Sequence, residues 1–157
     1  MTRIAVIGAG IGGVCLAREL ARHHDVTVFE KGRGVGGRMA TRYAGQFTID
    51  HGAQYFTVRD PEFYRFLTSA MARGIVRRWS EPAYTLKSDG ALSLHAGTSA
   101  RHVASPKMSS LAGFLAAPLT VHLNTRVDTL EKTEGRWRLL DDNTVVGEGF
   151  DWVLSAI

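Results

Sequence analysis

The sequence contains one cysteine among 157 residues, and it lacks both long apolar runs and long runs of basic residues. Because Cys15 has no second cysteine to pair with, an internal disulfide bond is excluded. No run of about 18 apolar residues occurs, so no membrane-spanning helix is predicted. The N-terminus begins on a strand pattern and has none of the features of a signal peptide. We therefore expect a reduced, cytoplasmic location and no membrane partner.

Basic residues exceed acidic residues by 19 to 15, which leaves a net charge of +4 and a pI near 9.6. Such a charge is compatible with nucleic acid binding, but the basic residues are scattered and no run of about five occurs. One local group, Arg33, Arg38 and Arg42, is denser. We interpret this group as a determinant for a small polyanionic ligand, and we expect no nucleic acid partner.

A strand, a helix and a second strand are predicted in the first thirty residues. Arg3–Ile7 is a short apolar run that stops at Gly8. Residues 11–23 repeat apolar side chains at helical spacing, and residues 26–30 form another apolar run that ends in Glu30. These three segments together predict a compact βαβ unit.

Helix and strand signals continue along the rest of the chain. Asp60 and Pro61 are typical of the N-cap and first position of a helix, which we expect to end at Arg73, before Gly74. Ser105 and Pro106 predict a second helix, up to about residue 116, by the same logic. Apolar and turn patterns predict strands at residues 75–79, 83–87, 91–94 and 119–123, and a β-meander at 125–131, 136–140 and 144–148. Residues 151–157 resemble a buried parallel strand, and because proteins rarely end on a core strand, we expect the chain to be truncated at its C-terminus.

Glycine is abundant, and Gly8-Ala9-Gly10-Ile11-Gly12-Gly13 matches the G-x-G-x-x-G pattern. The pattern alone is weak, but here it follows a strand and opens a helix, whose N-terminus attracts phosphate groups. Glu30 lies 22 positions after Gly8, where its carboxylate can accept hydrogen bonds from the hydroxyls of an adenosine ribose. These features predict a dinucleotide site, and the charge of Glu30 disfavours NADP.

The segment after Glu30 adds a second motif, Arg33-Gly34-Val35-Gly36-Gly37-Arg38. Paired glycines let the backbone pass close to a cofactor, and the Arg38 fork can bind phosphate oxygens. A strand-ending acid followed by R-x-x-G-G-R resembles the flavin-containing amine oxidase superfamily. Asp50-His51-Gly52-Ala53-Gln54-Tyr55-Phe56 is similar to the renalase-like branch of that superfamily, as are residues 106–111, 124–127 and 151–156.

The resemblance implies FAD as cofactor, with Val127 bonding the adenine through its backbone, and Ser155 and Ala156 near the phosphates. Residues 52–56 would pass along the flavin ring and its ribityl chain. The full set of candidate FAD-binding residues is Gly8, Gly10, Ile11, Gly12, Gly13, Glu30, Lys31, Arg33, Gly36, Gly37, Arg38, Met39, His51, Gly52, Ala53, Gln54, Tyr55, Val127, Ser155 and Ala156.

The expected fold is α/β: a Rossmann-like FAD-binding domain with a β-meander, formed by residues 1–57 and 106–157, and part of an α+β substrate domain in residues 58–105. The resemblance implies hydride transfer from a C–H next to nitrogen to flavin N5, followed by reduction of dioxygen to hydrogen peroxide. An amine or a dihydronicotinamide isomer would be the substrate. An NAD-dependent dehydrogenase, which shares the first glycine motif and Glu30, is one alternative. A nucleotide-binding module without catalysis is the other, because the expected truncation would remove part of the substrate domain. No catalytic residue is assigned.

Several further residues are interpreted as structural. We expect Cys15 to be a small core residue and His51 to have a positional role beside the flavin segment. His23 and His24 fall at a helix end, and no metal site is predicted there. Contact with a substrate is one interpretation of three further residues, but we expect their side chains in the apolar core: Met39, Trp79 and Tyr84.

Overall fold

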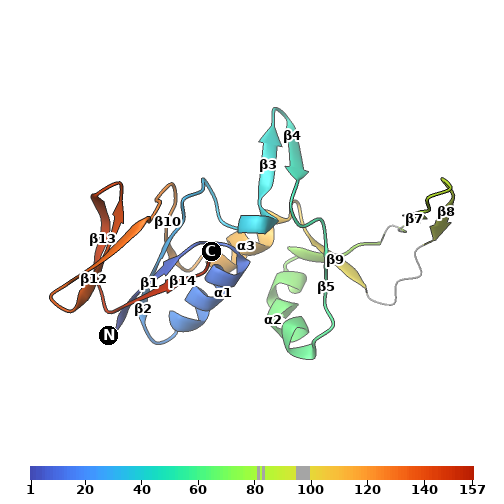
Figure 1. Cartoon of the computed structure of the whole chain (residues 1–157). Coiled ribbons are helices and arrows are strands. Elements are labelled where there is room, and N and C mark those ends of the chain that lie inside the picture. The colour runs from blue at the N-terminus through green and yellow to red at the C-terminus, as the bar shows by residue number, and fades with distance from the viewer. Residues whose placement is uncertain (81, 83, 95–99) are drawn as a thin grey trace.

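The computed structural model describes residues 1–80, 82, 84–94 and 100–157 (Figure 1). Strand β1 (Arg3–Ile7), helix α1 (Ile11–Leu20) and strand β2 (Asp25–Phe29) form where the apolar patterns predict them. Helix α1 buries Val14 and Ala17 on one side, as its helical spacing requires. The predicted βαβ unit is confirmed.

A parallel sheet with the strand order β10-β2-β1-β14 is the centre of the fold. Strands β10 (Thr120–His122) and β14 (Trp152–Ser155) both pair in parallel with strands of the βαβ unit. The C-terminal run is therefore a parallel strand, as predicted, and its Val153 lies opposite Ala5 of β1. The expectation that this strand is buried is wrong, because β14 is an edge strand whose residues are exposed or half-buried. Because all four strands run the same way, their carboxyl ends meet at one edge, where ligands of such sheets bind.

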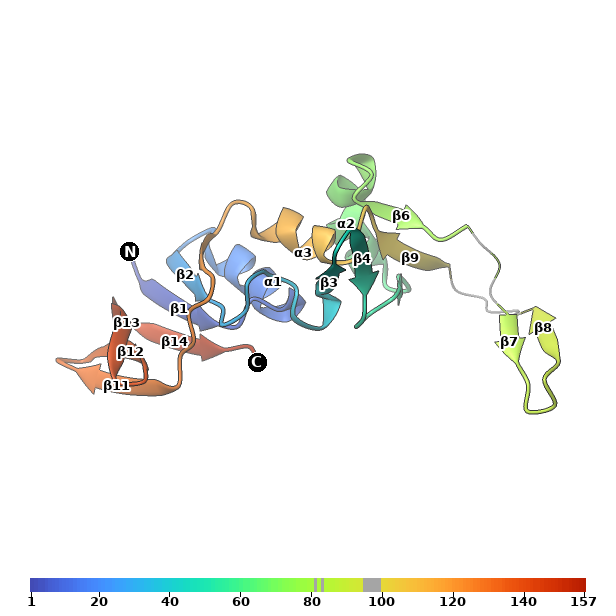
Figure 2. The ribbon, with the colours of Figure 1, turned by 90° about the horizontal axis from the view of Figure 1, so that it is seen from above.

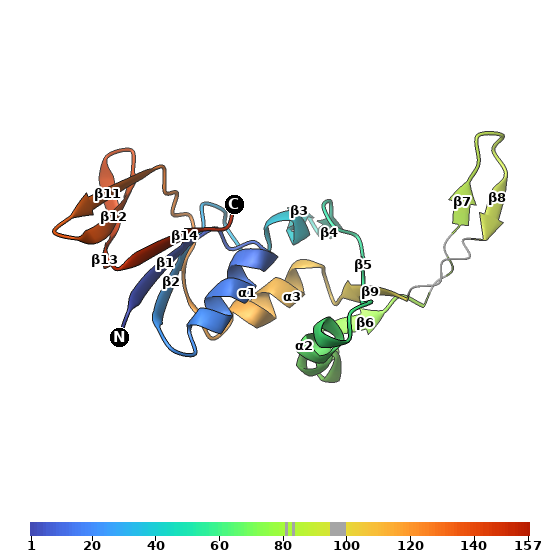
Figure 3. The ribbon, with the colours of Figure 1, turned by 60° about the horizontal axis from the view of Figure 1, so that its bottom comes forward.

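The two faces of this sheet are covered by different elements (Figures 2 and 3). Ile4 and Val6 of β1 face one core cluster, which also contains residues of α1 and of α3 (Ser109–Ala116). Ala5, between them, points to the opposite face and belongs to a second cluster. The alternation follows from the period of two in a strand, and it gives the sheet a helical layer on one side and a β layer on the other.

The β layer is an antiparallel meander of β11 (Thr129–Thr133), β12 (Arg136–Asp141) and β13 (Thr144–Phe150). Phe29 of the parallel sheet meets Phe150 of the meander edge to face at 5.8 Å between ring centroids. The Phe29 ring also lies against Gly147, where an added Cβ would come within 2.7 Å of it. The predicted meander is confirmed, although its first strand begins at Thr129 instead of residue 125.

Residues 56–104 form a smaller mixed unit. Helix α2 (Pro61–Ala72) begins as predicted, because the Asp60 Oδ1 atom accepts hydrogen bonds from the N–H groups of Glu62 and Phe63. Strands β5 (Phe56–Thr57), β6 (Val76–Arg78) and β9 (Arg101–Ala104) make one antiparallel sheet, and β7 (Tyr84–Leu86) pairs with β8 (Leu92–Leu94). Residue 83, the first of the expected strand 83–87, lies outside the described residues.

The sequence patterns missed four of the described strands and misplaced one helix start. Strands β5 and β9 and the hairpin of β3 (Thr41–Ala44) and β4 (Phe47–Asp50) were not predicted. Helix α3 begins at Ser109 instead of Ser105, because the Ser105 N–H continues the strand pairing and donates to the Ile75 carbonyl. Leu67, Val76 and Ala104 pack in the same core cluster as residues of α1 and α3. The predicted division into an FAD-binding domain and a substrate domain, at residues 57 and 106, stays a prediction.

None of the helices in the described ranges is long and apolar enough to cross a membrane.

Candidate functional site

The first glycine motif forms the turn from β1 into α1 at the carboxyl edge of the parallel sheet. Gly8 adopts a φ of +101°, which favours glycine, and its N–H donates to the Phe29 carbonyl. A Cβ on Gly13 would overlap the Gly8 carbonyl oxygen, so the third glycine of the pattern is required by packing. Gly12, by contrast, has nothing within 4 Å of such an atom. The motif thus leaves the start of α1 open on one side.

The N-terminus of α1 has the properties of an anion site. Gly10 is the N-cap residue and supplies no side-chain hydrogen bond, and the first turn contains no acidic residue. The first N–H groups of α1 therefore receive no hydrogen bond acceptor from the N-cap side chain, and they lie at the positive end of the helix dipole. A phosphate group is the natural ligand for such an end.

Glu30 lies at the end of β2 and connects the two glycine motifs. Its Oε2 atom accepts a hydrogen bond from the Ala9 N–H at 2.7 Å, and its Oε1 atom accepts one from the Gly32 N–H at 2.7 Å. These two bonds fix the orientation of the carboxylate. Since a carboxylate offers about four acceptor positions, Glu30 retains capacity for the hydroxyl groups of a ribose.

The second glycine motif packs directly on the first. The Gly36 N–H donates to the Ala9 carbonyl at 2.8 Å, and Gly36 forms a bridge with Gly10. Gly37 has a φ of +53°, and an added Cβ would lie 3.0 Å from the Gly10 Cα atom. From the sequence, we interpret Gly36 and Gly37 as positions where the backbone approaches a cofactor. The structure adds a second reason for these glycines, because their backbone packs closely against that of the first motif.

The third motif follows the second across another tight contact. The Ala53 N–H donates to the Arg38 carbonyl at 2.9 Å, and a Cβ on Gly52 would overlap that same oxygen. The Arg38 side chain is exposed, and within the described ranges no hydrogen bond or ion pair involves its guanidinium. Met39 is half-buried and packs against the first core cluster.

The side chains of the third motif are open to solvent. His51 and Gln54 are exposed, and the Tyr55 ring contacts two residues that sequence reasoning did not assign to the site. The guanidinium carbon of Arg101 lies 4.7 Å from the Tyr55 ring centroid, and the Trp79 ring meets it edge on at 6.0 Å. Trp79 is 38% exposed and Tyr84 is 59% exposed, so the expectation that both belong to the core is wrong. Strand β9, which the patterns missed, is what brings Arg101 there.

A cavity of about 170 Å³ lies beside Glu30 at the carboxyl edge. It brings together four of the predicted residues, Gly8, Glu30, Lys31 and Val127. Thr125 and Arg126 also line it, and the Thr125 N–H donates to the Glu30 carbonyl. No sequence signal pairs residue 125 with residue 30. Ser155 ends β14 next to this cavity, and Ala156 follows it, with its N–H donating to the Ile7 carbonyl.

A larger cavity of about 530 Å³ lies on the other side of Glu30. Arg33 and Arg42 both line it, whereas Arg38 does not. The dense basic group of the sequence is therefore divided in space. Thr41 and Ser109, which also line the cavity, are hydrogen-bonded to each other and were not predicted.

No metal centre is visible in the part of the chain that the structure describes: no three His, Cys, Asp or Glu side chains gather there. The N–H groups of His23 and His24 both donate to the Leu20 carbonyl at the end of α1.

Comparisons with known proteins agree with this geometry. Residues 6–70 match the family model of an NAD(P)-binding Rossmann-like domain. Over 72 residues, 45% of this chain, the sequence is 40% identical to a 4,4'-diapophytoene desaturase of Staphylococcus aureus, of which that stretch is 14%. A redesigned putrescine oxidase has the same fold, with a TM-score of 0.69 at 14% identity, over 98% of this chain and 58% of the oxidase. The structure of CtdE in complex with FAD is also similar, with a TM-score of 0.64 at 16% identity, over 99% of this chain and 37% of CtdE.

The chain thus carries a Rossmann-like α/β fold, with a parallel sheet and small antiparallel sheets. The part of the chain that matches the family model, residues 6–70, carries both glycine motifs and Glu30. The chain spans less than two thirds of the length of each of the three relatives above.

Proposed function

We propose that this chain binds FAD and forms the cofactor-holding part of a flavin-dependent oxidoreductase. The observation that carries the proposal is the contact between the two glycine motifs around one carboxylate. Ala9 of the first motif and Gly32, which directly precedes the second, both donate to Glu30. The open N-terminus of α1 adjoins this point. The residues present thus fit a dinucleotide with an adenosine at one end and a diphosphate in the middle.

In this proposal each group of residues has a separate task. Glu30 and the backbone of Val127 hold the adenosine, the start of α1 and Arg38 hold the diphosphate, and residues 52–55 lie along the flavin. When bound, FAD supplies the hydride acceptor at N5 and passes the electrons to dioxygen, which yields hydrogen peroxide. The protein orients the cofactor and excludes competing ligands.

The second glycine motif argues against an NAD-dependent dehydrogenase. Such an enzyme needs the first motif and the acidic residue, but it has no use for Arg38 directly after Gly36 and Gly37. The Arg38 side chain, exposed and without a partner among the described residues, is better explained by a second contact to a larger cofactor.

The substrate proposed from the renalase-like segment at residues 50–56 carries a C–H next to nitrogen, in an amine or a dihydronicotinamide isomer. A second candidate is the desaturation of a carbon–carbon bond. It is favoured by the 40% identity to the diapophytoene desaturase over 72 residues. Both reactions deliver a hydride to the same acceptor, and they differ in the donor.

An absorbance spectrum and the identity of the released cofactor test the proposal. Purified protein should show the bands of oxidised flavin, and acid should release FAD. Release of FMN or NAD alone would contradict it, because FMN lacks the adenosine that Glu30 is placed to hold. Anaerobic bleaching of the flavin by amines, dihydronicotinamide isomers or a conjugated polyene then separates the two candidate reactions.

A further inference from the structure

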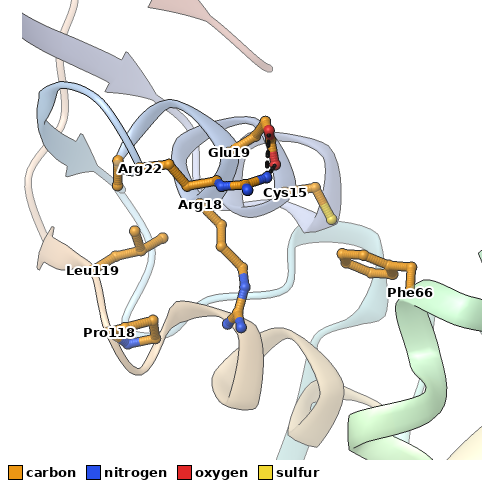
Figure 4. Close-up of a pocket in the computed structure, with 8 residues that line it drawn as sticks. Cys15, Arg18, Glu19, Arg22, Phe66, Pro118 and Leu119 are labelled. Carbon is orange, nitrogen blue, oxygen red and sulfur yellow. Dashed lines mark hydrogen bonds and ion pairs between the residues drawn. The ribbon is translucent and has the colours of Figure 1, made fainter.

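A second site of interest lies at the far end of α1 from the glycine motif. It is a cavity of about 530 Å³ between the last two turns of α1, helix α2 and the turn from α3 into β10 (Figure 4). Its volume is within the range of small-molecule pockets, about 300–1,000 Å³. None of the residues that line it takes part in the candidate cofactor site.

Apolar side chains form two opposite walls of this cavity. Phe66 projects from α2 towards Cys15 of α1, and Pro118 and Leu119 lie on the other side (Figure 4). The Phe66 side chain remains 42% exposed, although it belongs to a helix whose Leu67 is fully buried. An apolar ligand part that covered Phe66 and Leu119 would remove this surface from water, which is favourable.

Two arginines add positive charge between these walls. The Arg18 Nη1 atom donates to the Leu115 carbonyl at 3.2 Å, which holds the guanidinium at the cavity. A guanidinium has about five N–H donors, so most of them remain free for a ligand. Arg22 pairs with Glu19 at 3.0 Å, but both side chains are exposed and such pairs are weak. The residues that line the cavity include two guanidinium groups, of Arg18 and Arg22, and one carboxylate, of Glu19, so their net charge is +1.

We propose that this cavity binds a small amphipathic carboxylate, with its carboxylate on Arg18 and Arg22 and its apolar chain between Phe66 and Leu119. A single negative charge matches the excess charge of the lining. The planar forks of the two arginines suit the two oxygens of a carboxylate. Because Arg18 is already held by Leu115, little freedom is lost when it binds.

Cys15 provides a specific readout, because it is the single cysteine of the chain and lines the cavity. Burial raises the pKa of its thiol, and the charge of Arg18 opposes this rise only in part. Alkylation by iodoacetamide should therefore be slow at neutral pH and is best followed in alkaline buffer. Decanoate should slow it about tenfold or more at saturation, whereas decanol and decylamine should protect Cys15 far less.

Substitutions of the two arginines test whether decanoate binds in this cavity. Arg18→Gln and Arg22→Gln should each weaken decanoate binding, measured by calorimetry, roughly tenfold to a hundredfold. Arg65→Gln removes an exposed arginine of α2 outside the cavity and should leave the affinity unchanged. If Arg18→Gln fails to fold, Arg22→Gln still decides the role of charge. An unchanged alkylation rate with decanoate, or equal protection by decanol, would overturn the proposal, and neither result depends on FAD.

Discussion

Gly12 and Gly13 are adjacent in the sequence but have different surroundings. The space beside Gly13 is filled by the Gly8 carbonyl, while the space beside Gly12 is open. Packing therefore demands Gly13, whereas nothing in the described part of the chain explains the lack of a side chain at Gly12, which occupies an x position of the G-x-G-x-x-G pattern. The proposed cofactor, lying against Gly12, would supply that explanation.

This contrast yields a paired prediction. Gly13→Ala should destabilise the fold by about 4 kcal/mol or more, because its Cβ overlaps backbone that cannot move freely. Gly12→Ala should keep or slightly raise the stability, since alanine is the better helix former by about 1 kcal/mol. It should nevertheless weaken FAD binding. Urea denaturation and flavin fluorescence titration measure the two effects. Equal FAD affinity in Gly12→Ala and the parent would show that the cofactor does not approach there.

Arg38 is the second residue at which binding and folding can be separated. Its guanidinium is exposed and has no partner within the described ranges, so Arg38→Ala should leave the free energy of unfolding nearly unchanged. A lost charge-assisted contact to a diphosphate should weaken FAD binding roughly tenfold to a hundredfold. Fluorescence titration of FAD measures this, with Arg65→Ala as the control for the loss of one positive charge. An unchanged dissociation constant would mean that Arg38 is merely solvated.

At the scale of elements, two aspartates stabilise helix starts by different routes. Asp60 precedes α2 in the chain and caps it directly. Asp50 belongs to β4, yet its Oδ2 atom accepts a hydrogen bond from the Met108 N–H at the start of α3. Its Oδ1 atom accepts a second bond from the Thr41 hydroxyl at 2.6 Å. Asp50 thereby joins the β3–β4 hairpin to the helical layer.

Removal of either cap should reduce stability by a similar amount. Asp60→Ala and Asp50→Ala should each lower the free energy of unfolding by about 1–2 kcal/mol, as measured in urea. A double-mutant cycle with Thr41→Val should show coupling to Asp50 and none to Asp60. Additive effects of Thr41→Val and Asp50→Ala would mean that their hydrogen bond contributes nothing to stability.

At the scale of the whole molecule, the exposed surface is large. The chain of 17.2 kDa exposes 10,406 Å², whereas a compact monomer of that mass exposes about 7,800 Å². Part of the difference is apolar: Tyr84 and Leu94 face each other across β7 and β8, as do Leu86 and Leu92, and all four are exposed. Because these residues alternate with Thr85 and Ser93, one face of the hairpin is entirely apolar.

Apolar faces of this kind promote association. We expect the isolated chain to self-associate with rising concentration in sedimentation velocity experiments. The double substitution Leu86→Ser and Leu92→Ser should shift the distribution towards the monomer, while Ser93→Ala on the opposite face should not. FAD affinity should be the same in all three proteins, since the hairpin lies far from the glycine motifs (Figure 1). A monomer at every concentration would contradict this prediction.

The sequence by itself determined the elements whose signals are local. The βαβ unit, the position of Glu30 after β2, the Asp60 cap and the C-terminal parallel strand all follow from apolar spacing or from residues a few positions apart. Only the tertiary structure decided how these parts meet. The Gly37 contact with Gly10, the capping of α3 by Asp50 and the bond from Thr125 to Glu30 join residues about 27 to 95 positions apart. Such pairs depend on how the layers pack, which no local pattern encodes.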